Sequence, residues 1–203
     1  TRFGPNTTDE MAELWFQLLP RTSTGAAALD RMLLDRTIRD NAAYYEQRLR
    51  LDPGDAAALV HLGRTRLARQ QVSEAESYFR QATKAAPKLD EAHYYLGLVC
   101  RLQNRPGEAA AEFQRTLDLN PQHARANGNL GLMHLGAGRP EKAAEYLAVA
   151  VRLDATDLLA RNSLGQIRLQ QGRRVEALEL FRKVLELDPQ NAEARNGLAA
   201  AEK

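Results

Sequence analysis

Apolar and small residues recur along this chain with the spacing of helices that bury one face. One cluster occupies positions i, i+3, i+4 and i+7 counted from Leu59, and a second occupies i, i+4 and i+7 counted from Ala75. Such spacing places side chains on one side of an α-helix. The two clusters are separated by the polar pair Gln70 and Gln71, and the later counterparts of this pair contain Gly or Pro, which suits a short turn between helices. The pattern therefore predicts a helical hairpin.

The same pattern returns at one constant interval over most of the chain, the interval in sequence from Gly63 to Gly97. Four series of residues share this period: a Leu-Gly pair, an alanine, a large apolar residue four positions later, and a proline. In this order they are Leu62-Gly63, Leu96-Gly97, Leu130-Gly131 and Leu164-Gly165; Ala75, Ala109, Ala143 and Ala177; Phe79, Phe113, Leu147 and Phe181; and Pro53, Pro87, Pro121 and Pro189, with Ala155 at the missing proline position. Four independent series with one period indicate a repeat protein.

The glycine of each Leu-Gly pair needs a structural reason, because glycine in a helix interior costs about 1 kcal/mol relative to alanine. We predict that it lets the two helices of a hairpin approach closely and leaves room for the large apolar side chain of the second helix. The dipeptides Asp52-Pro53, Asn120-Pro121 and Asp188-Pro189 are predicted to end the second helices, since the residue before a proline disfavours the helical conformation.

The order Leu-Gly, Ala, Phe, Ala, Pro over one period resembles the tetratricopeptide repeat (TPR) family, whose repeat is about 34 residues long. The resemblance implies an all-α fold, a right-handed TPR superhelix or α-solenoid of about 4.5 helix-turn-helix repeats. Complete units would span 56–89, 90–123, 124–157 and 158–191. The family's tryptophan and tyrosine are replaced throughout, by Leu59, His93, Asn127 and Arg161 at the first position and by Arg66, Cys100, His134 and Arg168 at the second.

The two ends of the chain depart from the repeat. Residues 25–55 are predicted to form a degenerate half-repeat cap, because 41–52 match a second helix while the preceding stretch lacks the pattern. Residues 192–203 are predicted to form a C-terminal capping helix with a polar side. Atypical ends of this kind are typical of solenoids, whose terminal faces would otherwise be exposed.

Residues 1–24 form a non-repeat N-terminal segment, and 1–20 resemble a different family. The string FGPNTTDEM, residues 3–11, followed by an apolar stretch, is similar to the C-terminal end of copper type II, ascorbate-dependent monooxygenases. This resemblance implies that Met11 is a thioether ligand of the catalytic copper in a longer enzyme, and a soft thioether suits reduced copper. A packing or capping role for Met11 is the alternative. The chain begins with Thr1 rather than Met, which favours a processed product or a piece of a longer protein.

Composition and charge narrow the classes of partner. The chain has 203 residues, 44% of them hydrophobic and 27% charged, as expected of a folded soluble chain. Its 28 Lys and Arg against 26 Asp and Glu give a net charge of +2, so we expect neither nucleic acid nor a membrane as partner. We found no targeting or transmembrane segment, and the sequence assigns no compartment. The lone Cys100 excludes an internal disulfide.

The sequence offers no arrangement that would support catalysis. Its four histidines, His61, His93, His123 and His134, lie at different repeat positions and lack the spacing of metal ligands. No GxSxG, P-loop or GxGxxG motif occurs, and the repeated glycines are too far apart to cradle a phosphate. We therefore expect that this chain is not an enzyme, binds no cofactor and, apart from Met11 in a longer copper enzyme, binds no metal.

The first helix of each unit lines the concave groove in the TPR family, and this groove is the candidate binding site. Carried onto this sequence, the inward positions that we expect to contact a partner are His61, Arg64, Glu91, Tyr95, Leu98, Arg125, Asn129, Ser163 and Gln166. Tyrosine offers contact area at low entropy cost, asparagine can pair with a peptide backbone, and arginine can pair with carboxylates. The Lys and Asn set of the chaperone-binding carboxylate clamp does not match these positions.

The sequence thus predicts a scaffold or adaptor that binds a protein or peptide segment in its concave groove. An alternative is a C-terminal TPR tail of a larger copper-dependent monooxygenase-like protein, where the repeats dock or present the substrate. A third possibility is self-association through the terminal faces or through an edge that contains Trp15 and Phe16.

Overall fold

The structure is a computed structural model that describes residues 41–202. All regular secondary structure in this part of the chain is helical. The chain divides into two compact units, one that ends at Pro87 and one that begins at Lys88. The predicted non-repeat segment 1–24, the stretch 25–40 and Met11 lie outside the described residues.

The described part of the first unit contains a helix over residues 41–51 and one helical hairpin. The hairpin consists of α3 (Ala56–Ala68) and α4 (Val72–Ala85), which pack against each other. Ala75, Phe79 and Ala82 are the buried residues of α4, as the i, i+4, i+7 pattern predicts.

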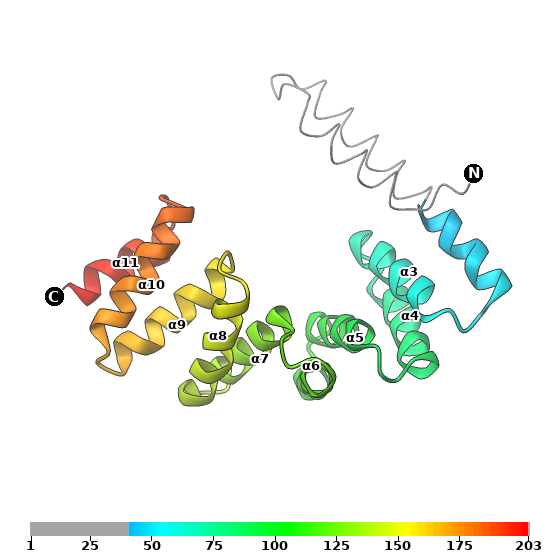
Figure 1. Ribbon diagram of the computed structural model, residues 1–203, viewed down its shortest axis with the longest axis horizontal. Coiled ribbons are helices and arrows are strands. Elements are labelled where there is room, and N and C mark those ends of the chain that lie inside the picture. The colour runs from blue at the N-terminus through cyan, green and yellow to red at the C-terminus, as the bar shows by residue number, and fades with distance from the viewer. Residues whose placement is uncertain (1–40, 203) are drawn as a thin grey trace, which may run out of the picture. The chain divides into compact units, whose positions relative to one another are not determined.

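The second unit contains three further hairpins and one final helix, which follow one another along the chain in Figure 1. The hairpins are α5 (Asp90–Leu102) with α6 (Pro106–Leu119), α7 (Ala124–Gly136) with α8 (Pro140–Leu153), and α9 (Leu158–Gln170) with α10 (Arg174–Leu187); α11 (Ala192–Ala201) closes the series. Within this unit each second helix packs against the helix that follows it, and α9 also contacts both α7 and α11. The predicted all-α TPR solenoid is confirmed.

The glycine of each Leu-Gly pair lies directly against the large side chain of its partner helix. A Cβ atom added at Gly63 would lie 2.5 Å from Phe79, one at Gly97 2.8 Å from Phe113, and one at Gly165 2.7 Å from Phe181. Carbon atoms in proteins do not pack this closely. The predicted reason for the recurring glycine, close approach of the two helices, is confirmed.

Each turn inside a hairpin uses one residue in the left-handed conformation, and these residues recur with the same period as the Leu-Gly pairs. They are Gln70, Asn104, Gly138 and Gly172, with φ values of 61°, 57°, 68° and 73°. A left-handed residue after the last helical turn ends a helix and redirects the chain. Only two of the four positions hold glycine, so the first two turns carry backbone strain.

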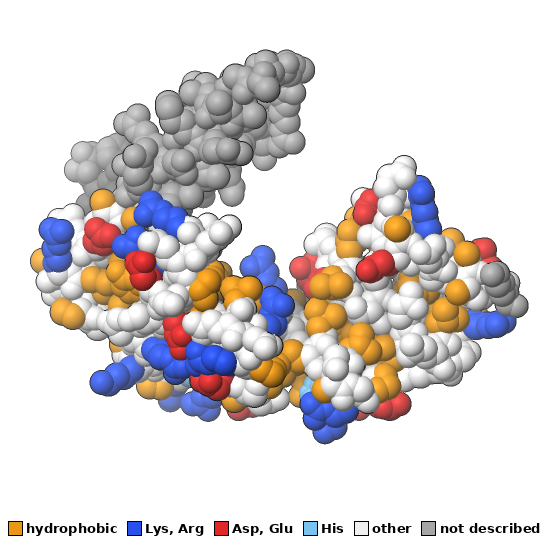
Figure 2. Space-filling view, turned by 180° about the vertical axis from the view of Figure 1, so that it is seen from behind, with side chains coloured by type: hydrophobic (Ala, Val, Ile, Leu, Met, Phe, Trp, Pro, Cys, Tyr) orange, Lys and Arg blue, Asp and Glu red, His pale blue; other side chains and the backbone are white. Residues whose placement is uncertain are grey.

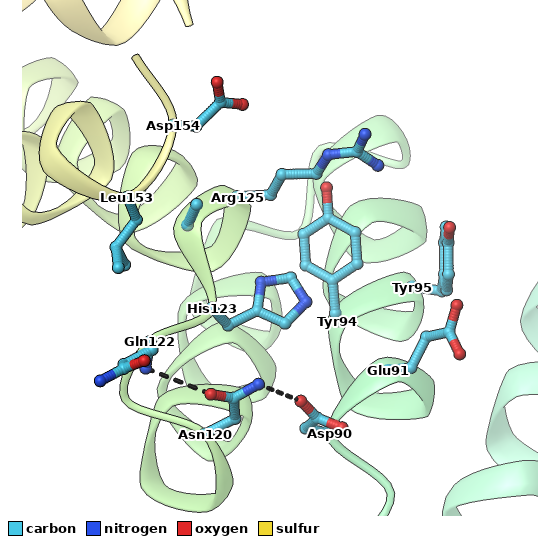
Figure 3. Close-up of a pocket in the computed structure, with 11 residues that line it drawn as sticks. Asp90, Glu91, Tyr94, Tyr95, Asn120, Gln122, His123, Arg125, Leu153 and Asp154 are labelled. Atoms are coloured by element: carbon cyan, nitrogen blue, oxygen red, sulfur yellow. Dashed lines mark hydrogen bonds between the residues drawn. The ribbon is translucent and has the colours of Figure 1, made fainter. Parts of the chain in front are cut away.

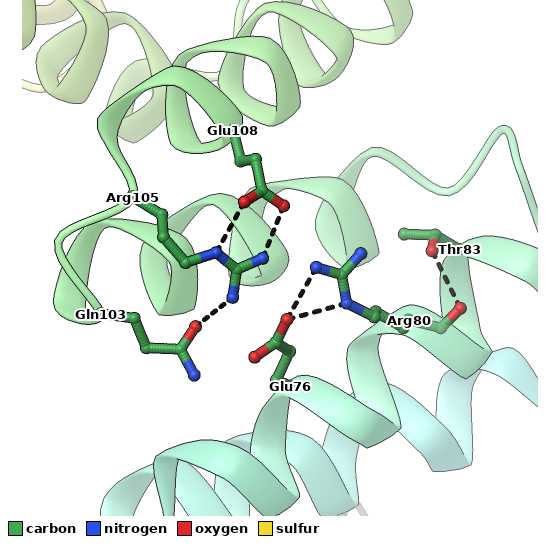
Figure 4. Close-up of polar contacts among 6 residues, drawn as sticks. All are labelled: Glu76, Arg80, Thr83, Gln103, Arg105 and Glu108. Carbon is green, nitrogen blue, oxygen red and sulfur yellow. Dashed lines mark hydrogen bonds and ion pairs between the residues drawn. The ribbon is translucent and has the colours of Figure 1, made fainter.

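A local side-chain pair lies at the start of three of the second helices, α4, α6 and α10. In α6, Arg105 Nε donates to Glu108 Oε1 at 2.7 Å, and Figure 4 shows this pair together with the Gln103 side chain. Gln71 with Glu74 and Arg173 with Glu176 form the equivalent pairs of α4 and α10. Exposed pairs of this kind add little stability each. On the face shown in Figure 2, positive and negative side chains are interspersed, in agreement with the small net charge.

Candidate functional site

The second unit contains a hollow of about 610 Å³ that lies between the first helices of two successive repeats. Four of its residues come from the first two turns of α5, and others come from the loop before α7, the start of α7 and the end of α8. The lining is Asp90, Glu91, Tyr94, Tyr95, Asn120, Gln122, His123, Ala124, Arg125, Leu153 and Asp154, and Figure 3 shows these side chains around the hollow.

The floor of the hollow is held by a short chain of hydrogen bonds. Asn120 Nδ2 donates to Asp90 Oδ2 at 2.7 Å, and Asn120 Oδ1 accepts from the backbone N–H of Gln122 at 3.2 Å. Both bonds are drawn in Figure 3. Because Asn120 is the C-cap of α6 and Asp90 begins α5, this bond fixes the end of one helix against the start of the other.

His123 is the N-cap of α7 and forms part of the wall. Its Nδ1 accepts a hydrogen bond from the backbone N–H of Ala126 at 3.1 Å, a role that Asp or Asn fills more often. Since Nδ1 is the acceptor, the ring is neutral and Nε2 carries the proton. Burial lowers the pKa of His123, and the nearby Asp90 carboxylate opposes this effect.

Two tyrosines and one arginine line the part of the hollow next to His123. The rings of Tyr94 and Tyr95 meet edge to face with centroids 5.2 Å apart, and the Tyr94 ring also packs against His123 at 4.6 Å. Only 6% of Tyr94 is exposed, whereas Tyr95 is half-buried. Burial raises the pKa of Tyr94, and the cationic side chain of Arg125, which Figure 3 shows beside the Tyr94 hydroxyl, counteracts it.

Asp154 closes the hollow at the end of α8. Its Oδ1 accepts from the Thr156 hydroxyl at 2.7 Å and from the Thr156 backbone N–H at 2.9 Å. These hydrogen bonds, the hydroxyl first, lower the pKa of Asp154, and Arg125 adds a smaller contribution in the same direction. Asp154 is therefore an anion at neutral pH, and the adjacent Leu153 adds a partly exposed apolar side chain.

Three of the nine residues predicted to line the groove meet in this hollow. They are Glu91, Tyr95 and Arg125, which come from equivalent first-helix faces of the second and third repeats. Among the other six, Leu98, Asn129 and Ser163 are half-buried and Gln166 is exposed, all in the second unit but outside the hollow. Asn129 Nδ2 donates to the backbone oxygen of Arg125 at 2.8 Å, so this amide bonds to its own helix.

The remaining two predicted residues, His61 and Arg64, lie on α3 in the first unit. The His61 ring stacks on Tyr45, with centroids 4.2 Å apart and planes only 7° from parallel. One face of His61 is therefore used in packing inside its own unit. Arg64 is exposed.

Several lining residues were not among the predicted ones, most clearly Tyr94 and His123. A comparison of repeat positions marks both as departures from the repeat. His123 stands where the next two repeats have the capping residues Asp157 and Asn191, and Tyr94 stands where the next repeat has Gly128. Such a comparison does not show that Tyr94 borders a cavity.

Two other expectations concern metals and membranes. Within residues 41–202, no three His, Cys, Asp or Glu side chains are grouped so that they could hold a metal ion. None of the helices in that same range is both long enough and apolar enough to span a bilayer. The expectations for Met11 as a copper ligand and for Trp15 and Phe16 in self-association fall outside the described residues and stay predictions.

Solved structures similar to this chain include MamA, YrrB and a chain of an APC/C complex. The chain aligns with MamA at a TM-score of 0.64 and 25% identity, over 81% of this chain and 96% of MamA. It aligns with YrrB, described as a TPR protein with an unusual peptide-binding site, at a TM-score of 0.62 and 23% identity, over 82% and 86% of the two chains. It aligns with a chain of the APC/C hetero-tetramer Cut9-Hcn1 at a TM-score of 0.65 and 20% identity, over 81% of this chain and 33% of that chain.

Sequence comparison identifies the family. No curated protein matches the chain. A family model described as tetratricopeptide repeat matches residues 38–90, 62–118 and 103–157, and a second, described as TPR repeat, matches 165–202. These ranges begin after residue 37, so they do not touch the stretch that resembles copper monooxygenases. They cover well over half of the sequence, and the chain belongs to the tetratricopeptide repeat family.

Proposed function

We propose that this chain is a protein-interaction scaffold that binds a peptide or protein segment along its first-helix face, with the hollow between α5 and α7 as the main contact. The observation that carries the proposal is the convergence of Glu91, Tyr95 and Arg125 from two successive repeats onto one cavity. Its volume of about 610 Å³ suits one or two side chains of an extended segment.

The chemistry of the lining supports binding rather than catalysis. Tyr95 and Arg125 belong to the residue types that contribute most to protein interfaces. His123 Nδ1 is engaged as a helix cap, and Asp90 is bonded to Asn120, so both serve the structure of the site. Family membership and the similarity to YrrB, a TPR protein with a peptide-binding site, favour the same function.

The test is selection of peptides from a random phage-displayed library on the full chain, followed by affinity measurements with synthetic versions of the selected peptides. We expect Tyr95→Ala to weaken binding by about tenfold, which corresponds to about 1.4 kcal/mol, and Arg125→Ala to change the affinity by a comparable factor, in a direction set by the charge of the bound side chain. Arg115→Ala on α6 is the matched control, because it removes an exposed arginine that does not line the hollow. Selected peptides that bind both hollow variants as tightly as the unmodified chain would refute the proposal.

A further inference from the structure

The charges around the hollow are unequal, and they indicate what kind of side chain enters it. Among the described residues that line it, three carboxylates, those of Asp90, Glu91 and Asp154, stand against the guanidinium of Arg125. His123 adds no charge, because its Nδ1 accepts the hydrogen bond from Ala126 N–H. This lining therefore has two more negative charges than positive ones.

The guanidinium in the hollow has an anion among its neighbours. Arg125 contributes to the low pKa of Asp154 and lies beside the Tyr94 hydroxyl in Figure 3. The carboxylate of Asp90 is bonded to a neutral donor, the Asn120 amide, so that bond does not cancel its charge. An incoming carboxylate would meet more repulsion than attraction here, and an incoming cation would meet the reverse.

The aromatic residues favour the same ligand. A cation is attracted to the face of a tyrosine ring, and the interaction strengthens when the site is partly shielded from water. Tyr95 is half-buried and contacts Tyr94 edge to face, and Figure 3 shows its ring on the side of α5 where the Glu91 carboxylate lies. Carboxylates combined with tyrosine rings form a recognisable site for a positively charged side chain.

The other repeats of the second unit show that this combination is local. Glu91, Tyr94 and Tyr95 correspond, one repeat later, to Arg125, Gly128 and Asn129. In the repeat after that, they correspond to Leu159, Asn162 and Ser163. Neither set contains a carboxylate or an aromatic ring. The acidic and aromatic lining is thus a property of the second repeat and not of the repeat scaffold.

We infer that the hollow receives a lysine or arginine side chain of the partner segment, held between the carboxylates of Asp90 and Glu91 and the ring of Tyr95. The partly exposed Leu153 at the other side provides apolar contact for a neighbouring residue of the same segment. This inference rests on the proposed function and specifies the chemistry of the partner at that site.

The peptide selection separates the two proposals. Enrichment of Lys or Arg among peptides that lose affinity on Tyr95→Ala supports both. Peptides that depend on Tyr95 but contain no enriched basic residue, or contain an acidic one, overturn this inference and leave the proposed function intact. Peptides that do not depend on Tyr95 or Arg125 overturn the proposed function itself.

A direct probe is titration of the full chain with N-acetyl-arginine amide, followed through backbone amide signals in NMR spectra. We expect the signals of Tyr94, Tyr95 and Arg125 to shift, with no comparable shift from the citrulline analogue, which keeps the shape and lacks the charge. The acetylated glutamate amide should also fail to shift them. Equal shifts from citrulline, or stronger ones from glutamate, would overturn the inference.

The matched variants are Glu91→Gln and Glu141→Gln. Both glutamates lie in the first turn of a helix, of α5 and α8 respectively, so both variants lose the same favourable interaction with the helix dipole. Only Glu91 lines the hollow. We expect Glu91→Gln to weaken binding of N-acetyl-arginine amide by roughly three- to tenfold and Glu141→Gln to leave it unchanged. Equal effects of the two variants would overturn the inference.

Discussion

Helix α7 contains three glycines whose surroundings differ so much that the same substitution should have opposite effects. A Cβ atom at Gly131 would lie 2.6 Å from Leu147 Cγ and 3.2 Å from the backbone nitrogen of Leu147. At Gly128 the nearest atom would be Asp157 Oδ2 at 3.4 Å, an ordinary contact. At Gly136 no atom lies within 4 Å. We predict that Gly131→Ala destabilises the chain and that Gly136→Ala stabilises it.

The magnitudes follow from two opposing contributions. Alanine is favoured over glycine in a helix interior by about 1 kcal/mol, and by about half of that near the last turn. An extra methyl group in a packed core costs about 1 to 3 kcal/mol. For Gly131→Ala the upper part of this range applies, because Leu147 Cγ and N are not at the end of a flexible side chain. We expect a net loss of about 1 to 2 kcal/mol for Gly131→Ala and a gain of about 0.5 kcal/mol for Gly136→Ala.

The assay is urea unfolding of the full chain and its variants, followed by circular dichroism at the helical minimum. Gly128→Ala provides the intermediate case and should leave the midpoint unchanged or raise it slightly. A midpoint for Gly131→Ala equal to or above that of the unmodified chain would refute the reasoning that these glycines exist to admit the side chain of the partner helix.

Three further predictions concern a turn, the last helix and one histidine. Gln70→Gly should raise stability by about 0.5 to 1 kcal/mol in the same urea assay, because glycine relieves the left-handed strain, whereas Arg69→Gly at a φ of −88° should lower it. Gly197→Ala should accelerate hydrogen exchange in α11 alone, because the new Cβ would collide with the ring of Phe181; unchanged exchange would contradict this packing. The pKa of His123 is lower in the folded chain than in the unfolded chain. Its contribution to stability is therefore complete at pH values above the unfolded-state pKa and is lost as the pH falls toward the folded-state pKa. The His123→Asn variant, which keeps a capping side chain, should therefore lose less stability than the unmodified chain between about pH 7.5 and about pH 5.5, as urea midpoints at the two pH values would show.

The repeated part of the fold could be predicted from the sequence because the same packing problem recurs in every hairpin. Gly97 and Phe113 must be neighbours if two helices are to approach closely, and the same pair of positions recurs as Gly165 and Phe181. The repeat period therefore reports on contacts inside the chain, and each repeat confirms the others. This redundancy explains why the hairpins and their glycine contacts follow from one sequence.

One buried position escaped such prediction, because its residues differ in every repeat. His93, Asn127 and Arg161 stand where the family has tryptophan, and all three are buried. Asn127 Nδ2 donates to the backbone oxygens of the preceding loop at 3.1 and 3.2 Å, Arg161 Nη2 donates to the oxygen of Ala155, and His93 Nδ1 lies 2.7 Å from Glu112 Oε2. Each of these buried polar side chains has a different hydrogen-bond partner, in keeping with the general need of buried polar groups for such partners. Because the partners differ from repeat to repeat, no periodic pattern in the sequence predicts them.

The hollow could be predicted only in part for the same reason. Glu91, Tyr95 and Arg125, which line the hollow, were among the predicted residues because the groove positions of the family could be projected onto the sequence. Tyr94 was missed because its register equivalents include the buried Val60 of the first unit and Gly128, so the position reads as one of core packing. Whether a ring at this position fills the core or borders a cavity depends on the size of its neighbours, which a single sequence does not show.

Binding specificity in this chain should therefore reside where the repeat pattern is weakest. A residue that obeys the repeat period is constrained by its contacts with the adjacent helix, as Gly131 is by Leu147, and can change only at a cost in stability. The residues of the hollow that depart from the period are not part of a contact that recurs in every repeat: Glu91 becomes Arg125 one repeat later, and Tyr95 becomes Asn129. Replacing both by the residues of the next repeat, Glu91→Arg with Tyr95→Asn, should alter which peptides are selected. The lost dipole interaction and ring contact should cost about 1 kcal/mol of stability or less in the urea assay. A loss of stability comparable to that of Gly131→Ala would show that scaffold and binding surface are not separable in this way.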